Sequence, residues 1–151
     1  MLDDADRRIL RQLQAAPDLP TAELAERARV TASTLTRRLE RMRSDGVLLG
    51  RSAQIHWPAL GYEVEVSLRI TLDKTQPRAF DEFLAEARGI PEVLEIQTFL
   101  GRVDVRLSII ARDMPHYQDI YRRRVLALPH IADIEALMHV ARIKSDEALP
   151  L

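Results

Sequence analysis

Residues 22–46, AELAERARVTASTLTRRLERMRSDG, constrain the fold more than any other part of this sequence. Apolar residues recur with the helical period on both sides of a short break at Arg29-Val30, which predicts two short helices joined by a tight turn. Thr31 is the expected cap of the second helix, and Gly46 stands where helices commonly end in left-handed backbone. Two short helices joined in this way form a helix-turn-helix unit.

The second of these helices is expected to have one buried face and one exposed face. At about 100° per residue, the apolar side chains share one stripe. They are Leu35, Leu39 and Met42. Hydroxyl groups and an arginine gather in the opposite first turns, where a helix lying in the major groove meets base edges. We therefore expect base contacts from Ser33, Thr34, Thr36 and Arg37.

Other arginines near this helix are better placed for the phosphate backbone, which adds affinity without sequence information. They are Arg38, Arg41 and Arg51. The formal net charge of the chain is only −1, but residues 29–51 hold six arginines against two acidic residues. Phosphate contact needs a local basic stripe and not a basic protein. A solvated amphipathic helix shows the same pattern, so an effector-sensing module that does not bind DNA stays open as an alternative.

The composition excludes several other classes of protein. The chain has 151 residues, enough for one ordinary domain or two small ones, and no cysteine. Disulfides and thiolate metal sites are therefore excluded. No apolar run approaches the ~20 residues that span a bilayer. The start, MLDDADRRIL, is acidic where a signal peptide is basic, so we expect a cytoplasmic protein without a membrane segment.

The period of the apolar residues changes from 3.6 to 2 after Gly61. The first helix is expected at 4–15, and a second one capped by Thr21. A small hairpin, or wing, is expected from 47–49 and 52–56. Beyond Gly61 we expect strands at 63–72, 93–100, 103–111 and 131–144, a helix opened by Pro77, and a helix from Met114 to Leu128. The resulting β-α-β-β-α-β order is that of ferredoxin-like sheets.

The predicted class is therefore α+β, with an N-terminal winged helix-turn-helix and a C-terminal ferredoxin-like βαββαβ sandwich domain. We expect a DNA-binding domain at 1–51, a connector at 52–61 and the sheet domain at 62–151. Helices would cover one face of the antiparallel sheet and leave the other bare. The last strand is apolar on both faces, which suggests a two-fold contact between two copies.

The whole chain resembles the Lrp/AsnC (leucine-responsive/asparagine-operon, or feast/famine) family of transcriptional regulators. The matching residues agree in order and spacing along the entire sequence. They are Leu2-Asp3, Asp6, Ile9-Leu10, Leu13-Gln14, Glu23-Leu24-Ala25, Val30-Thr31, Arg38-Leu39, Met42, Asp45–Leu48, Gly50, Leu60-Gly61, Gly101, Asp104, Ile143-Lys144 and Ala148–Leu151.

This resemblance implies a sequence-specific regulator that binds pseudo-palindromic promoter sites on double-stranded DNA. It also implies dimers, assembled into octamers or larger rings, and a small effector, usually an amino acid, that shifts assembly or DNA affinity. The effector site would lie between dimers. Its residues would be Gly101, Arg102, Val103 and Asp104 in one loop, with Leu137, Met138 and His139 from the last strand. A glycine turn offers amides to a carboxylate, and Asp104 offers a charge to an ammonium group.

The sequence also departs from the family pattern. Pro17–Pro20 replaces a common Gly-Arg-Ile-Ser, Arg51 replaces a tyrosine after Gly50, and Trp57-Pro58 replaces an Asn-Pro or Asp-Pro. Valines at 103 and 105 stand where an aromatic often flanks the aspartate, so the resemblance does not name the effector.

A haem-precursor decarboxylase on a similar two-domain fold is the enzymatic alternative. The four histidines, His56, His116, His130 and His139, form no close metal-ligand spacing, and the chain lacks a glycine-rich phosphate loop. We therefore expect neither an enzyme nor a metal or other cofactor.

Overall fold

The computed structural model describes residues 1–145 and 148–151. Its residues divide into two units, one of Met1–Gln54 with Lys144–Leu151 and one of Ile55–Ile143. The chain therefore passes twice from one unit to the other. Residues 144–145 and 148–151, expected with the sheet domain, group with the N-terminal unit. The helices of the described residues are too short or too polar to cross a membrane.

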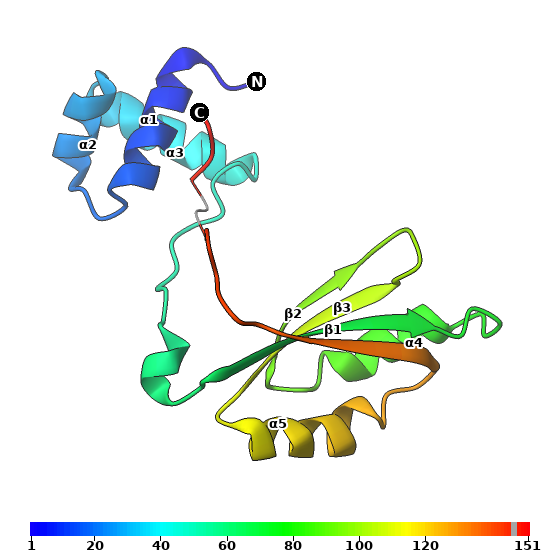
Figure 1. The fold of residues 1–151 in the computed structure, drawn as a ribbon. Coiled ribbons are helices and arrows are strands. Elements are labelled where there is room, and N and C mark those ends of the chain that lie inside the picture. The colour runs from blue at the N-terminus through cyan, green and yellow to red at the C-terminus, as the bar shows by residue number, and fades with distance from the viewer. Residues whose placement is uncertain (146–147) are drawn as a thin grey trace. The chain divides into compact units, whose positions relative to one another are not determined.

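The N-terminal unit is built from α1 (Asp4–Ala15), α2 (Thr21–Ala28) and α3 (Ala32–Ser44) (Figure 1). Asp3 caps α1, where it forms a capping box with Asp6. The expected cap of α2 was wrong: Thr21 is the first helical residue, and Pro20 precedes it without a side-chain hydrogen bond. A proline at this point already fixes an extended entry to the helix.

A small apolar core holds the three helices together. Ile9, Leu24 and Leu35 are nearly or fully inaccessible to solvent and form its centre with Met42. Burial of side chains of this kind stabilises a fold by about 1.5–3 kcal/mol each. Between α2 and α3 the chain turns through Arg29, which has left-handed backbone with φ of 57°.

The expected hairpin after α3 was wrong, because no strand forms between Val47 and His56. The amides of Val47 and Leu48 both donate to the carbonyl of Met42, which closes the end of the helix. Gly46 has a φ of 71°, as expected for a residue at this end. The residues that follow are almost all exposed and find no strand to pair with, so the segment lacks the ladder that makes a hairpin.

The second unit begins with a short 3₁₀ turn, η1 (Trp57–Leu60), and continues in the expected β-α-β-β-α-β order. Its elements are β1 (Val64–Leu72), α4 (Ala79–Ala87), β2 (Val93–Thr98), β3 (Val105–Ala111), α5 (Met114–Ile120), the π-helical turn η2 (Tyr121–Val125) and β4 (Ile131–Met138). The antiparallel sheet has the strand order β2-β3-β1-β4. Helices α4 and α5 lie on the same face of it (Figure 1).

Alternation along the central strands produces the core of this unit. Val66, Leu68 and Ile70 of β1 are fully buried, as is Leu107 of β3, and Phe83 of α4 packs into the same cluster. The last strand is shorter than the sequence predicted and ends at Met138 instead of residue 144. Its partner β1 begins at Val64, so beyond the bond from the His139 amide to the Glu65 carbonyl there is no strand left to pair with.

Candidate nucleic-acid interface

Helix α3 divides into faces as the sequence predicted. Leu35 and Met42 are fully buried and Leu39 is half-buried, while Ser33, Thr36 and Arg37 are exposed. Thr31 caps the helix, since its side chain accepts a hydrogen bond from the Thr34 amide. The exposed face therefore presents polar groups on a helix whose position is fixed by its buried side.

The hydroxyl groups at the start of α3 already have partners within the helix. Thr34 Oγ1 accepts a hydrogen bond of 2.9 Å from Thr31, and Thr36 Oγ1 donates at 3.0 Å to the carbonyl of Ala32. Ser33 Oγ lies 3.3 Å from Thr31 Oγ1. These bonds orient the hydroxyl groups, and each oxygen keeps lone pairs for a ligand.

Arg37 differs from the neighbouring arginines. Among the described residues its guanidinium group has no hydrogen-bond or ion-pair partner, and its side chain is exposed. Arginine can bond bidentately to guanine in the major groove, and a free guanidinium group is available for that contact. Arg51, which follows Gly50, is exposed as well.

Arg38 and Arg41, expected at phosphates, reach across to the first turn of α1. Arg38 Nη1 lies 2.7 Å from Asp3 Oδ2 and 2.8 Å from Asp6 Oδ1, and Arg41 Nη2 lies 2.5 Å from Asp6 Oδ2. Asp6 is fully buried, whereas the Arg41 side chain is 47% exposed and keeps donors toward solvent. Asp3, Asp6, Arg38 and Arg41 thus form one ionic cluster that joins α1 to α3, the proposed DNA-reading helix.

The cluster shifts the pKa values of its members. Hydrogen bonds from Arg38 and from the Asp6 amide lower the pKa of Asp3 to about 2. Burial pushes the pKa of Asp6 upward, but hydrogen bonds from Arg38 and the Asp3 amide outweigh burial and hold it below its ordinary value. The same bonds to Asp3 and Asp6 raise the pKa of Arg38. The sequence analysis missed Asp3 and Asp6 as supports of α3, although their capping-box spacing was a visible signal.

The expected effector loop lies between β2 and β3. Gly101 and Arg102 are exposed and Val103 is half-buried, but Asp104 is only 2% exposed. Its Oδ2 accepts a hydrogen bond of 2.9 Å from the Leu72 amide, and its Oδ1 lies 3.1 Å from Lys74 Nζ. Asp104 therefore fastens the loop to the end of β1, and an amino group of this chain already occupies its free oxygen.

The other expected effector residues lie at the opposite end of β1. Leu137 is half-buried, Met138 is 45% exposed and pairs with Val66, and His139 Nδ1 lies 3.6 Å from Glu65 Oε2. A hollow of about 160 Å³ beside His139 is lined in part by Trp57 and Arg142. Seven residues of strand separate Glu65 from Leu72, roughly 20 Å, so one chain does not bring the two halves of the expected site together.

Comparison with known proteins identifies the family. A model of the Lrp/AsnC ligand-binding domain matches residues 65–149, and a model of winged helix-turn-helix DNA-binding domains matches residues 2–48. The chain belongs to the Lrp/AsnC family. It is 30% identical to the HTH-type transcriptional regulator Zrp of Zymomonas mobilis over 152 residues, which covers 99% of this chain and 97% of that protein.

Solved structures of Lrp/AsnC regulators have the same fold. A regulator from Neisseria meningitidis in complex with L-methionine gives a TM-score of 0.90 at 25% identity, covering 99% of this chain and 97% of that one. A feast or famine regulatory protein from Mycobacterium tuberculosis, also complexed with L-methionine, gives 0.86 at 28% identity, covering 99% of both chains. The chain is thus similar along its full length to DNA-binding transcriptional regulators.

Proposed function

We propose that this Lrp/AsnC regulator acts as a dimer whose two α3 helices read the two halves of a pseudo-palindromic site on double-stranded DNA. The observation that carries the proposal is the exposed Arg37, which has no partner within the described part of the chain, beside oriented hydroxyl groups on a helix packed from behind. In this proposal Ser33, Thr34, Thr36 and Arg37 contact bases. Arg41 and Arg51 contact phosphates, as does Arg38 through its partly exposed edge. Because its proposed target is promoter DNA, we place this regulator in the cytoplasm.

The open face of the sheet supports the dimer. A row of polar residues crosses it in register, with Gln97 beside Arg106, Arg106 beside Arg69, and Arg69 beside Glu135. Two arginines directly opposite each other repel. Arg106 Nε is also buried without a hydrogen-bond partner among the described residues. Arg106 Nη2 lies 3.0 Å from Glu95 Oε2 and Arg69 Nη1 lies 3.8 Å from Glu135 Oε2, so both arginines have a carboxylate within this chain. An acceptor from a second copy would satisfy Arg106 Nε, and a two-fold contact supplies that acceptor to both copies at once.

We propose an amino acid as the effector, because two structural neighbours were solved with L-methionine. The amides of Gly101, Arg102 and Val103 would hold its carboxylate, and Asp104 would hold its ammonium group. The residues from 137 to 139 lie too far away in the same chain, so they would come from another copy. An octamer or larger ring, in which dimers meet, offers such a composite site.

We further propose that the chain is not an enzyme and holds no cofactor, and three histidines support this with structural contacts. His116 Nδ1 accepts a hydrogen bond from the Arg112 amide, and His130 Nε2 lies 2.6 Å from Glu82 Oε2. His139 lies beside Glu65. Each of them orients part of the fold, and the described residues contain no group of three or more His, Asp or Glu that could hold a metal ion.

Selection of binding sites from a random-sequence DNA library tests the proposed mode of binding. The expected product is a pair of inverted half-sites about one helical turn apart, ~34 Å, because two copies of α3 related by a two-fold axis meet successive major grooves. Enriched sequences without two-fold symmetry would contradict the dimeric mode. Failure to enrich any sequence would favour the effector-sensing module that does not bind DNA.

A further inference from the structure

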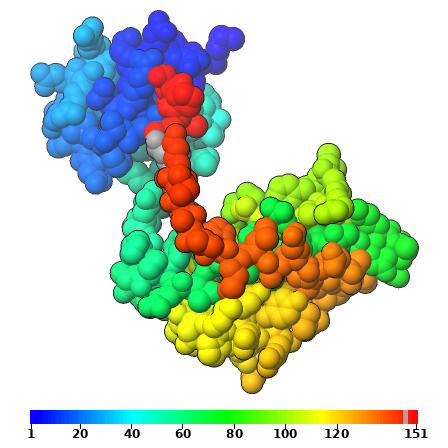
Figure 2. Space-filling model, in the orientation of Figure 1, coloured from blue at the N-terminus to red at the C-terminus, as the bar shows by residue number. Residues whose placement is uncertain are grey.

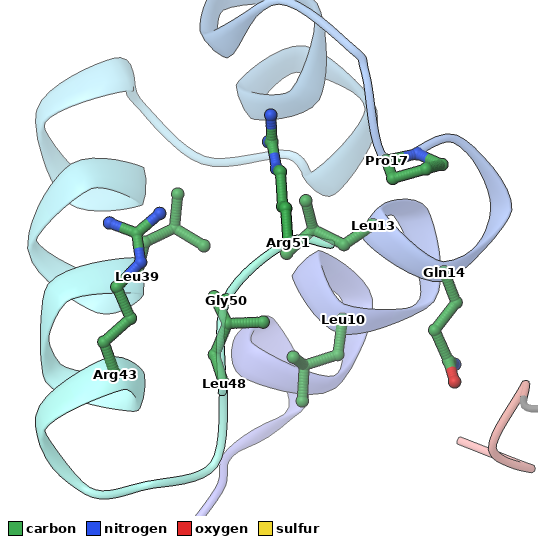
Figure 3. A pocket seen from close by; sticks show the side chains of 9 residues that line it. All are labelled: Leu10, Leu13, Gln14, Pro17, Leu39, Arg43, Leu48, Gly50 and Arg51. Atoms are coloured by element: carbon green, nitrogen blue, oxygen red, sulfur yellow. The ribbon is translucent and has the colours of Figure 1, made fainter. Parts of the chain in front are cut away.

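A pocket of about 190 Å³ lies within the N-terminal unit, between α1, the second half of α3 and the segment that follows α3. Figure 3 shows side chains from all three parts of the chain around it. Its lining residues all belong to the range Met1–Gln54, so the pocket is formed within a single domain. The pocket has no part in the proposed contacts with bases, which lie on the exposed face of α3.

The wall of the pocket is made mostly of leucine side chains. Leu10 and Leu13 come from α1, Leu39 from α3, and Leu48 from the segment after α3, and Pro17 adds a further apolar surface (Figure 3). A cavity of about 150 Å³ with walls of this kind binds benzene. The pocket therefore has the size and the lining for one small apolar body.

Two arginines add positive charge to this apolar pocket. Arg43 in the last turn of α3 and Arg51 beyond Gly50 both line it, and both are exposed. Neither guanidinium group has a hydrogen-bond or ion-pair partner among the described residues, and the described lining contains no acidic side chain. A guanidinium group bonds a carboxylate through two parallel N–H···O bonds. An anion with an apolar body would therefore meet complementary groups here.

The C-terminal residues lie beside the pocket and do not fill it. The Leu149 amide donates a hydrogen bond of 2.5 Å to Gln14 Oε1, and Gln14 Nε2 donates one of 3.3 Å to the Leu149 carbonyl. Figure 2 shows the last residues, in red, against the blue helices of the same unit. Gln14 lines the pocket, but the described C-terminal residues do not. The described part of the chain thus leaves room for a ligand.

We propose that this pocket binds a small monocarboxylate whose apolar body is about the size of a benzene ring. The apolar body packs among the four leucines, and the carboxylate pairs with Arg43 and Arg51. The site is separate from the proposed effector loop around Asp104, and it takes a ligand without an ammonium group, because its described lining offers no carboxylate to hold one.

Such a ligand would act on the proposed contact between Arg51 and DNA. A carboxylate paired with Arg51 neutralises the charge that would attract a phosphate, so bound ligand and bound DNA oppose each other. Phosphate contacts carry no sequence information, so the loss of affinity should be the same on any sequence. This consequence rests on the proposed function, whereas binding of the carboxylate does not.

A ligand-observed NMR titration of the full chain without DNA tests the pocket. Phenylacetate carries both the ring and the charge, phenylacetamide carries the ring alone, and acetate carries the charge alone. Phenylacetate should bind about fivefold more tightly than phenylacetamide, which is what a good exposed ion pair supplies. It should bind about tenfold or more tightly than acetate, because the ring buries apolar surface. Failure of phenylacetate to bind, or equal binding of either other probe, would overturn the proposal.

Two substitutions locate the bound carboxylate. Arg43→Gln and Arg51→Gln each remove one charge from an exposed position, and each should weaken phenylacetate by about threefold and leave phenylacetamide unchanged. Arg7→Gln is the matched control, because Arg7 is exposed on α1 outside the pocket and its side chain has no partner among the described residues. It should bind phenylacetate as the wild type does. Unchanged affinity for phenylacetate in both pocket variants would place the ligand elsewhere and overturn the proposal.

The DNA arm uses a duplex enriched by the random-library selection and a scrambled duplex of the same length. Saturating phenylacetate should weaken binding of both by a similar factor of about three, and acetate at the same concentration controls for ionic strength. Unchanged DNA affinity would overturn the opposition between ligand and DNA. If the chain binds neither duplex, the proposed function fails, and the NMR titration still decides whether the pocket binds the carboxylate.

Discussion

Asp6→Asn is the substitution that most sharply tests how the reading helix is held. The side chain of Asp6 is 0% exposed and lies within 2.8 Å of Arg38 and 2.5 Å of Arg41. An asparagine keeps the shape of the side chain but removes the negative charge that the guanidinium groups of Arg38 and Arg41 share. Removing one partner of a buried ion pair costs about 3–5 kcal/mol.

Solvent reduces that cost here, because the side chains of Arg38 and Arg41 are 21% and 47% exposed. Arg38 also keeps Asp3 as a partner. We therefore expect the N-terminal unit to lose about 2–3 kcal/mol of stability, below the value for a fully buried pair.

Amide hydrogen exchange measures this loss locally, since the two units need not unfold together. The opening free energy of the slowest amides in α1 and α3 should fall by about 2–3 kcal/mol, and that of β1 and β3 should not change. Asp4→Asn is the control, because Asp4 is exposed in the same first turn without an ion pair among the described residues, and should cost about 0.3–1 kcal/mol through the helix dipole. A loss in Asp6→Asn no larger than in this control would refute the reasoning.

Three further predictions follow from the same contacts. Because the pKa of Asp3 falls from 3.8 to about 2 on folding, its contribution to stability should be constant above about pH 5 and disappear as the pH falls toward 2. Acid titration of unfolding should show a shallower decline in Asp3→Asn, and an unchanged profile would contradict the shift. Arg41→Ala should lower the slope of log affinity against log salt concentration by about 0.9, because the proposed phosphate contact is lost. DNA binding measured across salt concentrations checks this, and an unchanged slope would confine Arg41 to the ionic cluster. Lys74→Met should tighten amino-acid binding measured by calorimetry, because it frees the oxygen of Asp104 for the ligand's ammonium group, and weaker binding would count against Asp104 as the ammonium site.

The sequence correctly predicted the helices and strands that show a clear period of apolar residues within their own segment. Alternation in β1 and the apolar stripe of α3 depend on neighbours along the chain, and both were confirmed. The hairpin after α3 was wrong because its residues fit a strand but find no partner to pair with, and β4 ended early for the same reason. Pairing is a property of two segments, so one segment's pattern does not determine it.

In the candidate site, too, features set by the local sequence were predicted and contacts between distant segments were not. The exposed and buried faces of α3 follow from its own sequence. The contacts of Arg38 and Arg41 with Asp6 join residues more than thirty positions apart, and the helix wheel carries no information about them. The two halves of the expected effector site were grouped by resemblance alone. The register of β1 with β3 and β4 puts them at opposite ends of one strand.

Specific readout of DNA by Arg37 is the central claim, and competition binding of the wild type and Arg37→Ala tests it directly. The two duplexes are a selected site and a scrambled sequence of the same length. One bidentate base contact contributes about 1–3 kcal/mol of discrimination, so the variant should lose about tenfold or more of its preference for the selected site. Its affinity for the scrambled duplex should stay close to that of the wild type. Retention of the full preference, or equal weakening on both duplexes, would contradict the claim.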